Sequence, residues 1–388
     1  MPAVGSSTFP WTRSLRVAAC IFLSTRLLIF GIWSGIACLG TMEHDGVAET
    51  TLVLDGGRIA QELRRLARQN DANWYFDVAT NGYEHRPFDL SAQANWAFFP
   101  LHPLLWRCAM QIWSDGPLVG MALANLFFLF GLVLLHRLAV RSAYDARTAD
   151  RAVLFAAICP TSYFFSLPWS ESLFFFLSVA TFWAAFRRSW GIMFFAGAAA
   201  CACRFAGVFL IPAIFAMLWA DRSSLPRVAW VAATAFLLGL LSFMVLLHFD
   251  TNNALAFIDI QPMWGRHLII PYKAFGVVLL KPYFLASDWN LRPLNFAAFA
   301  FGIGACRSLI AQRQAGFALF LGLGLLAPAF TGSLTSLARY AFGLFPYALA
   351  AGAAMRRRNT ERMIALASIS LLVIMTIAFQ KGLTFAGA

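Results

Sequence analysis

The residues best suited to chemistry gather in one stretch between two apolar runs. It extends from Asn70 to Trp106 and reads NDANWYFDVATNGYEHRPFDLSAQANWAFFPLHPLLW. Its carboxylates can act as general bases that take a proton from a hydroxyl group. Membrane insertion alone does not call for acids, amides, histidines and tryptophans together. We therefore expect catalysis here, where the protein meets the lipid surface.

Asp71 is the carboxylate to which we assign the catalytic role. The sequence predicts a short helix over residues 72–81 that ends at Gly82. Asp71 would then lie at the head of this helix, where it or Asn70 can cap the helix in a purely structural role. The aromatic residues that follow favour a functional role instead. The candidates for substrate contact in this stretch are Trp74, Tyr75, Asp77 and His102, although a helix turns Asp77 away from Asp71.

A second acid, Glu171, begins an apolar run directly after Pro168-Trp169-Ser170. A carboxylate at the centre of a membrane costs about 2.5–3.5 kcal/mol on insertion scales, so an acid in such a run is a functional hypothesis by default. Near the interface the cost falls, and the start of a helix favours negative charge. A substrate-contacting role and a structural role both remain open for Glu171.

Two arginines stand in apolar surroundings. Arg204 has apolar sequence on both sides, and Arg339 is predicted at the start of a helix, where a cation gains nothing from the helix dipole and needs an anionic partner. The planar guanidinium fork suits phosphate. Bound lipid headgroups are the alternative ligands.

A second polar segment adds to this set, with interfacial anchoring as its alternative role. The candidates for binding the donor phosphate are Arg204, Arg339, Arg266 and His267, and those for further substrate contact are Glu171, Gln261, Trp264 and Tyr340.

Composition places these residues in a membrane protein. Hydrophobic residues make up 60% of the 388 residues and charged residues 12%, whereas soluble domains have about 45–50% and about 25%. The net charge of +12 does not indicate nucleic acid, because the chain has no recognition motif and most of its thirty cations are arginines in short loops. We expect a polytopic, all-α protein whose surroundings are membrane lipids.

Cysteines and histidines show no metal or disulfide pattern. The seven cysteines are odd in number and lie mostly in apolar runs. Cys201 and Cys203 would point to opposite sides of a helix. The spacing of His85, His102 and His267 matches no zinc motif. We expect neither a metal nor a cofactor.

Apolar runs and arginine positions predict about eleven spans, with the N-terminus in the cytoplasm and the C-terminus outside. The whole chain, residues 1–388, forms one multi-pass domain, with outer segments at 41–97 and 250–292. The first outer segment contains an amphipathic helix, residues 57–69, that lies on the membrane surface or packs as a loop helix. The predicted spans are 17–39, 118–140, 152–167, 171–187, two within 190–220 that turn near Arg204, 228–249, 293–306, 315–331, 338–355 and 363–380.

The order of six motifs resembles the PIG-V family of multi-pass mannosyltransferases. The motifs are Asp71-x-x-Trp74-Tyr75 with Gly82-Tyr83, Phe98-Phe99-Pro100-Leu101-x-Pro103, Pro160-Thr161-Ser162 with Ser170-Glu171-Ser172, Cys203-Arg204-Phe205-Ala206-Gly207, Gln261-x-x-Trp264-Gly265-Arg266, and Arg339-Tyr340 with Phe345-Pro346. Two positions depart from the family pattern: Asn70 stands where the family usually has Trp, and His102 where Tyr is frequent.

The resemblance implies a GT-C glycosyltransferase that uses a polyprenyl- or dolichyl-phosphate sugar as its donor. In this family an acid of the first outer loop is the expected catalytic residue, and that position falls on Asp71. We expect a bacterial member in the inner (plasma) membrane, with its site facing the periplasm; in a eukaryote the site would face the lumen of the endoplasmic reticulum.

Our hypothesis is the inverting transfer of a hexose, mannose by preference, to a lipid-linked or glycan acceptor. A transporter or flippase of an anionic lipid-linked sugar is the alternative, but such proteins commonly show internal repeats, and this sequence has none. An inactive binding protein is a third reading, which the departure at Asn70 keeps open.

Overall fold

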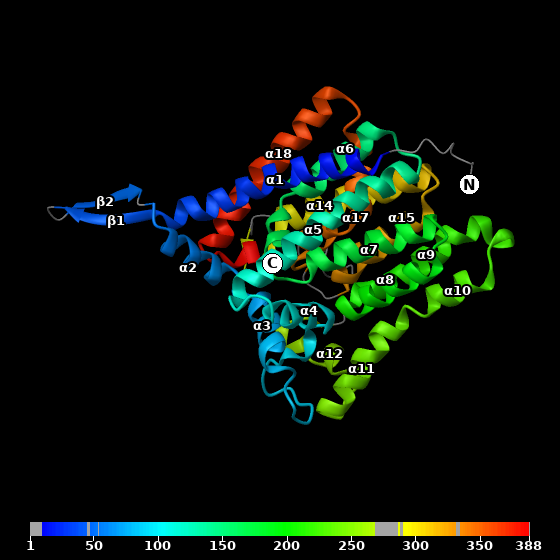
Figure 1. Cartoon of the computed structure of the whole chain (residues 1–388), viewed down its shortest axis with the longest axis horizontal. Helices are drawn as coiled ribbons and strands as arrows, with labels where there is room; N and C mark the ends of the chain where they lie inside the picture. Colours follow the sequence, from blue (N-terminus) through cyan, green and yellow to red (C-terminus); the bar gives the residue numbers. More distant parts are fainter. Residues whose placement is uncertain are drawn as a thin grey trace.

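The computed structural model describes residues 10–44, 47–52, 54–267, 286–287, 290–330 and 334–387. Most of these residues form helices that pack side by side (Figure 1). The α-helices are α1 (Trp11–Ala37), α2 (Gly56–Leu66), α3 (Asp71–Asn81), α4 (Leu101–Met110), α5 (Gly116–Arg141), α6 (Ala146–Ile158), α7 (Glu171–Phe186), α8 (Trp190–Cys203), α9 (Leu210–Leu218), α10 (Arg227–Thr234), α11 (Leu237–Thr251), α12 (Ala256–Asp259), α14 (Arg292–Ala311), α15 (Ala315–Ala329), α16 (Leu337–Gly343), α17 (Phe345–Ala354) and α18 (Arg358–Gln380).

Six helical segments within the described residues are long and apolar enough to cross a membrane. They are Trp11–Ala37, Gly116–Arg141, Phe205–Ser224, Arg227–Thr251, Arg292–Ala311 and Arg358–Gln380, and the shorter apolar helices α7, α8, α15 and α17 lie among them. The chain is therefore a multi-pass integral membrane protein, although the predicted number of eleven spans is not confirmed.

Two predicted spans are interrupted in the structure. The span predicted at 152–167 ends as α6 at Ile158, just before Pro160, and a 3-10 helix, Ser162–Ser166, follows. The span predicted at 338–355 divides into α16 and α17 at Leu344, and Pro346 lies in the first turn of α17. Proline lacks the N–H that a continuing helix needs, so both breaks have a local cause.

Two pairs of short strands complete the described structure, which is otherwise helical as predicted. Strands β1 (Leu39–His44) and β2 (Val47–Leu52) form an antiparallel hairpin whose register runs from Leu39↔Leu52 to His44↔Val47. This hairpin projects from the helices at the end of α1 (Figure 1). A second pair, β3 (Ala286–Ser287) and β4 (Asn290–Leu291), precedes α14.

The chain turns at Arg204, as the sequence predicted. Arg204 has an extended backbone (φ −156°, ψ 150°), and a 3-10 helix, Phe205–Phe209, packs back against α8 before α9 begins. Close contact also fixes α8 from its other side, because a Cβ atom at Gly239 of α11 would lie 1.8 Å from the carbonyl oxygen of Ala198. Arg204 is thereby held at the end of a tightly packed helix.

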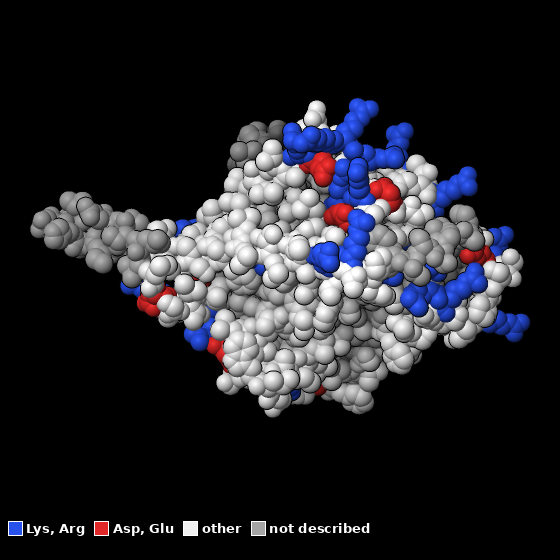
Figure 2. All heavy atoms as spheres, turned by 45° about the horizontal axis from the view of Figure 1, so that its top comes forward, with Lys and Arg blue, Asp and Glu red and all other residues white. Residues whose placement is uncertain are grey.

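Basic side chains gather at one end of the helices. Three ion pairs lie there. Arg13–Asp150 joins the start of α1 to α6, and Arg151–Glu361 joins α6 to the start of α18. Arg188–Asp221 joins the turn after α7 to the turn after α9. Figure 2 shows many Lys and Arg side chains gathered on one part of the surface. The residues with predicted chemistry lie toward the other end, where α3, the start of α7 and the end of α8 meet.

Candidate active site

Four charged side chains from distant parts of the chain form one connected group, which we call the charge cluster: Asp71, Glu171, Arg204 and Arg339. Arg339 Nη2 donates to Asp71 Oδ2 at 2.9 Å, and Arg339 Nε lies 2.8 Å from Glu171 Oε1. Arg204 Nη1 lies 2.6 Å from the same Glu171 oxygen. Glu171 and Arg339 are 5% and 6% exposed, whereas Asp71 is 31% exposed and is the carboxylate that a substrate can reach.

Asp71 contributes to the cluster instead of capping its helix. Asn70 is the N-cap residue of α3, and its side chain makes no capping hydrogen bond. Asn70 has a positive φ of 56°, a conformation that Asn adopts more readily than a bulky residue such as Trp. At the other end, Gly82 closes α3 with a φ of 88°, and its N–H donates to the Val78 carbonyl, as the sequence predicted.

Tyr75 and His102 fix the segment that leads to Glu171. Tyr75 follows Asp71 by four residues on the same face of α3, and its hydroxyl lies 2.7 Å from Ser170 Oγ. His102 Nε2 lies 3.0 Å from the Pro168 carbonyl oxygen, and its ring meets Tyr75 edge to face. Burial lowers the pKa of His102 to about 4, so the ring is neutral near pH 7 and donates to that carbonyl.

Arg266 is a further cation beside the cluster, held by uncharged partners. Its Nη1 donates to Gln261 Oε1 at 3.3 Å and its Nη2 to the Tyr340 hydroxyl at 3.2 Å. The Tyr340 ring in turn lies against Arg204 and Arg339, at 5.2 and 5.1 Å from the ring centroid. His267 is exposed, and among the described residues nothing joins it to this group.

Aromatic side chains form a wall beside the charges. Trp74 stacks on Phe98 with ring centroids 5.8 Å apart, and Trp264 meets both rings edge to face. Trp74 lies on the same helix as Asp71, and Trp264 is two residues from Arg266. The predicted substrate-contacting aromatics therefore border one site with the predicted charged residues.

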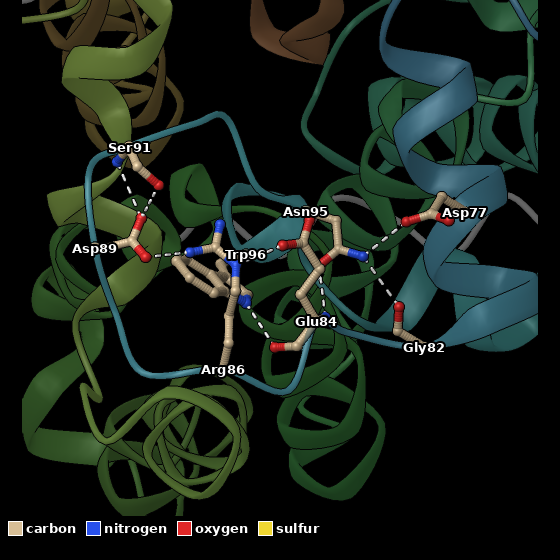
Figure 3. Close-up of polar contacts among 8 residues, drawn as sticks. All are labelled: Asp77, Gly82, Glu84, Arg86, Asp89, Ser91, Asn95 and Trp96. Atoms are coloured by element: carbon tan, nitrogen blue, oxygen red, sulfur yellow. Dashed lines mark hydrogen bonds and ion pairs between the residues drawn. The ribbon is translucent and has the colours of Figure 1, made fainter.

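Asp77 is directed elsewhere. Its Oδ1 accepts a hydrogen bond from Asn81 and its Oδ2 one from Asn95, each at 2.8 Å. Asn95 also donates to the Gly82 carbonyl and accepts from the N–H of Glu84 (Figure 3). Asp77 therefore holds the loop that follows α3, and its contacts give no support to substrate binding.

Three residues that support the site were not among those predicted from the sequence. Trp169 stacks on the Arg339 guanidinium at 4.4 Å, and Ser170 receives a hydrogen bond from Arg204. Arg26 of α1 donates to the Ala157 and Ser162 carbonyls and to the hydroxyls of Ser162 and Ser166. The sequence could have pointed to Arg26, because an arginine inside an apolar run of 23 residues (17–39) is costly in a membrane and therefore indicates a specific role.

Metal ligands do not gather in the described part of the chain, which contains no group of three or more His, Cys, Asp or Glu side chains suited to an ion. The cysteines are free thiols, and Cys201 and Cys203 are buried. The two carboxylates of the site, Asp71 and Glu171, both contact the Arg339 guanidinium, which lies between them.

Comparison with solved structures shows a known membrane-enzyme fold. The fold is similar to that of the Archaeoglobus fulgidus oligosaccharyltransferase in its apo form, with a TM-score of 0.50 and 13% identity over 98% of this chain. The same enzyme tethered to an acceptor peptide containing the NVT sequon gives a TM-score of 0.49 and 14% identity, covering 95% of this chain and 53% of that one. This chain covers 56% of the apo enzyme's chain. The likeness to the apo enzyme is one of fold.

Comparison with protein families identifies the chain more closely. Residues 58–260 match the family described as Mannosyltransferase (PIG-V), and the chain belongs to this family. It is therefore a membrane glycosyltransferase, which confirms the family and the enzyme class predicted from the motifs. No curated protein matches the chain.

Proposed function

We propose that this protein transfers a hexose, mannose by preference, from a polyprenyl- or dolichyl-phosphate sugar to a hydroxyl group of a lipid-linked or glycan acceptor. One observation carries the proposal: a partly exposed carboxylate, Asp71, lies in contact with a buried group of arginines. The transfer needs a base for the acceptor and cations for the phosphate at the same place.

The charge balance of the site supports a phosphodiester donor. Arg204, Arg266 and Arg339 contribute three positive charges, and Asp71 and Glu171 contribute two negative ones. The surplus of one positive charge matches the single negative charge of a sugar phosphodiester. When the sugar leaves, the phosphate gains a further negative charge, which fixed arginine donors stabilise better than water does.

The reaction follows from this arrangement. Asp71 takes the proton of the acceptor hydroxyl, and the oxygen of that hydroxyl attacks the anomeric carbon from the side opposite the phosphate. The bond between that carbon and the phosphate oxygen breaks, and the lipid phosphate leaves with the electron pair. A single displacement of this kind inverts the anomeric configuration, as in glycosidases that use one carboxylate as a base. Trp74 and Trp264 provide apolar faces for the sugar.

We also propose that the site faces outward. Positively charged loops favour the cytoplasmic side, and the arginine-rich end defined by the Arg13–Asp150 and Arg151–Glu361 pairs lies away from α3, the helix that begins with Asp71 (Figure 1). The segments 41–97 and 250–292 are then the outer loops of a single domain, in the periplasm of a bacterium or in the lumen of a eukaryotic endoplasmic reticulum.

A product assay tests the proposal against its rivals. Purified protein in vesicles receives polyprenyl-phosphate [³H]mannose and a membrane-lipid extract, and radioactive products are separated from the donor. The proposal expects a new glycosylated product. A flippase would instead move the donor between leaflets without consuming it, and a binding protein would do neither. Either of those results contradicts the proposal.

A further inference from the structure

Arg339 differs from the other cations of the site because most of its guanidinium group is already in contact with side chains of the protein. Its Nη2 donates to Asp71, its Nε lies against Glu171, and Trp169 covers its planar face. Only 6% of its side chain is exposed. The N–H of Ala338 donates to Asn295 of α14 at 2.8 Å, which fixes the backbone that carries Arg339. A guanidinium in these contacts has few N–H donors left for a phosphate.

Glu171 explains why Arg339 stays where it is. A buried carboxylate is costly unless cations and hydrogen bonds compensate it, and Glu171 lies between Arg204 and Arg339. Because Glu171 is 5% exposed and Asp71 is 31% exposed, the acceptor can approach only the second of these acids. Glu171 therefore anchors Arg339, and Arg339 presents one oxygen of Asp71 in a fixed orientation.

Arg204 and Arg266 are better placed to meet an anion. Arg204 is 16% exposed, and Arg266 is half-buried with hydrogen bonds only to the uncharged side chains of Gln261 and Tyr340 among the described residues. Tyr340 joins the two, because its ring contacts Arg204 and its hydroxyl receives Arg266. The surplus positive charge of the site is thus carried at Arg266.

From these contacts we propose a division of labour that deepens the proposed function and rests on it. Arg339 is a positioning residue that orients Asp71, whereas Arg204 and Arg266 bind the donor phosphate. Loss of Arg339 then impairs the chemical step with the donor still bound, and loss of Arg266 impairs donor binding.

The experiment measures kcat and the donor KM for Arg339→Gln, Arg339→Lys and Arg266→Gln. Arg339→Gln should lower kcat at least tenfold and leave the donor KM within about twofold, because the donor phosphate is held by other arginines. Arg339→Lys keeps the charge beside Asp71 and should recover part of the lost kcat.

Arg266→Gln should raise the donor KM about tenfold or more and lower kcat much less than Arg339→Gln does. The division of labour is overturned if Arg339→Gln raises the donor KM as Arg266→Gln does, or if Arg339→Gln leaves kcat unchanged. Should Arg339→Gln fail to fold, Arg339→Lys alone decides: a raised donor KM contradicts the proposal, and a lowered kcat at unchanged donor KM supports it. Full activity of Asp71→Asn would instead refute the proposed function itself.

Discussion

Glu171 makes the strongest single prediction about stability. Replacing it with Gln removes the carboxylate that lies 2.6 Å from Arg204 and 2.8 Å from Arg339, and leaves two neighbouring cations. Removing one partner of a buried ion pair costs about 3–5 kcal/mol. Arg339 keeps Asp71, and Arg204 is 16% exposed to solvent, so we expect the lower end of that range, a loss of about 3 kcal/mol.

The assay is equilibrium unfolding in mixed detergent micelles, followed by tryptophan fluorescence. Glu84→Gln is the matched control, because Glu84 forms a partly exposed pair with Arg86 near the surface, and surface pairs contribute about 0–1 kcal/mol. The double variant Glu171→Gln/Arg204→Gln should be less destabilised than the sum of the two single variants, since it removes a cation together with its partner. A loss for Glu171→Gln no larger than that of the control would refute the idea that Glu171 balances the two arginines.

Three further perturbations address the elements that support the site. Arg26→Met leaves buried carbonyl and hydroxyl acceptors of the α6–α7 connection unpaired, and the same unfolding assay should show a loss of about 2–4 kcal/mol; a loss below about 1 kcal/mol would contradict the role assigned to this arginine. Gly239→Ala forces a Cβ atom against the α8 backbone and should cost about 1–3 kcal/mol or more in unfolding free energy, whereas Gly304→Ala, which meets open space, should be close to neutral. For His102 the folded-state pKa of about 4 lies below the ordinary 6.5, so the unfolded chain takes up the proton first and stability should fall as pH drops from 6.5 toward 4. His102→Gln should flatten that dependence in unfolding curves measured at pH 7, 6 and 5, and an unchanged slope would show that another group causes it.

The cost of burying charge made the main site residues visible in the sequence. Glu171, Arg204 and Arg339 each stand in apolar surroundings that a mere surface charge would avoid, and the structure brings them into contact with one another. Local signals likewise placed Asp71 at the head of a short helix that ends at Gly82. What spacing did not reveal is the partner of each charge, because Asp71 and Arg339 are 268 residues apart and meet only through the packing of helices.

Other features depended on contacts that no local pattern encodes. Helical spacing turned Asp77 away from Asp71, but it did not reveal that Asp77 accepts a hydrogen bond from Asn95 of the following loop. The arginines of α2 seemed to oppose the expected orientation of the chain. In the structure Arg64 pairs with Asp115 and Arg65 with Glu62. Ion pairs within the protein therefore balance much of the positive charge that these arginines would place on the outer side.

The most direct test of the central claim is the single-turnover rate of mannose transfer by Asp71→Asn at saturating polyprenyl-phosphate mannose. Asp89→Asn serves as the control, because it makes the same chemical change on an exposed loop of the same segment. If Asp71 is the general base, its variant should bind the donor normally and transfer mannose about 10²–10⁴-fold more slowly, while the control keeps the wild-type rate. A folded Asp71→Asn protein that transfers mannose at the wild-type rate would contradict the account.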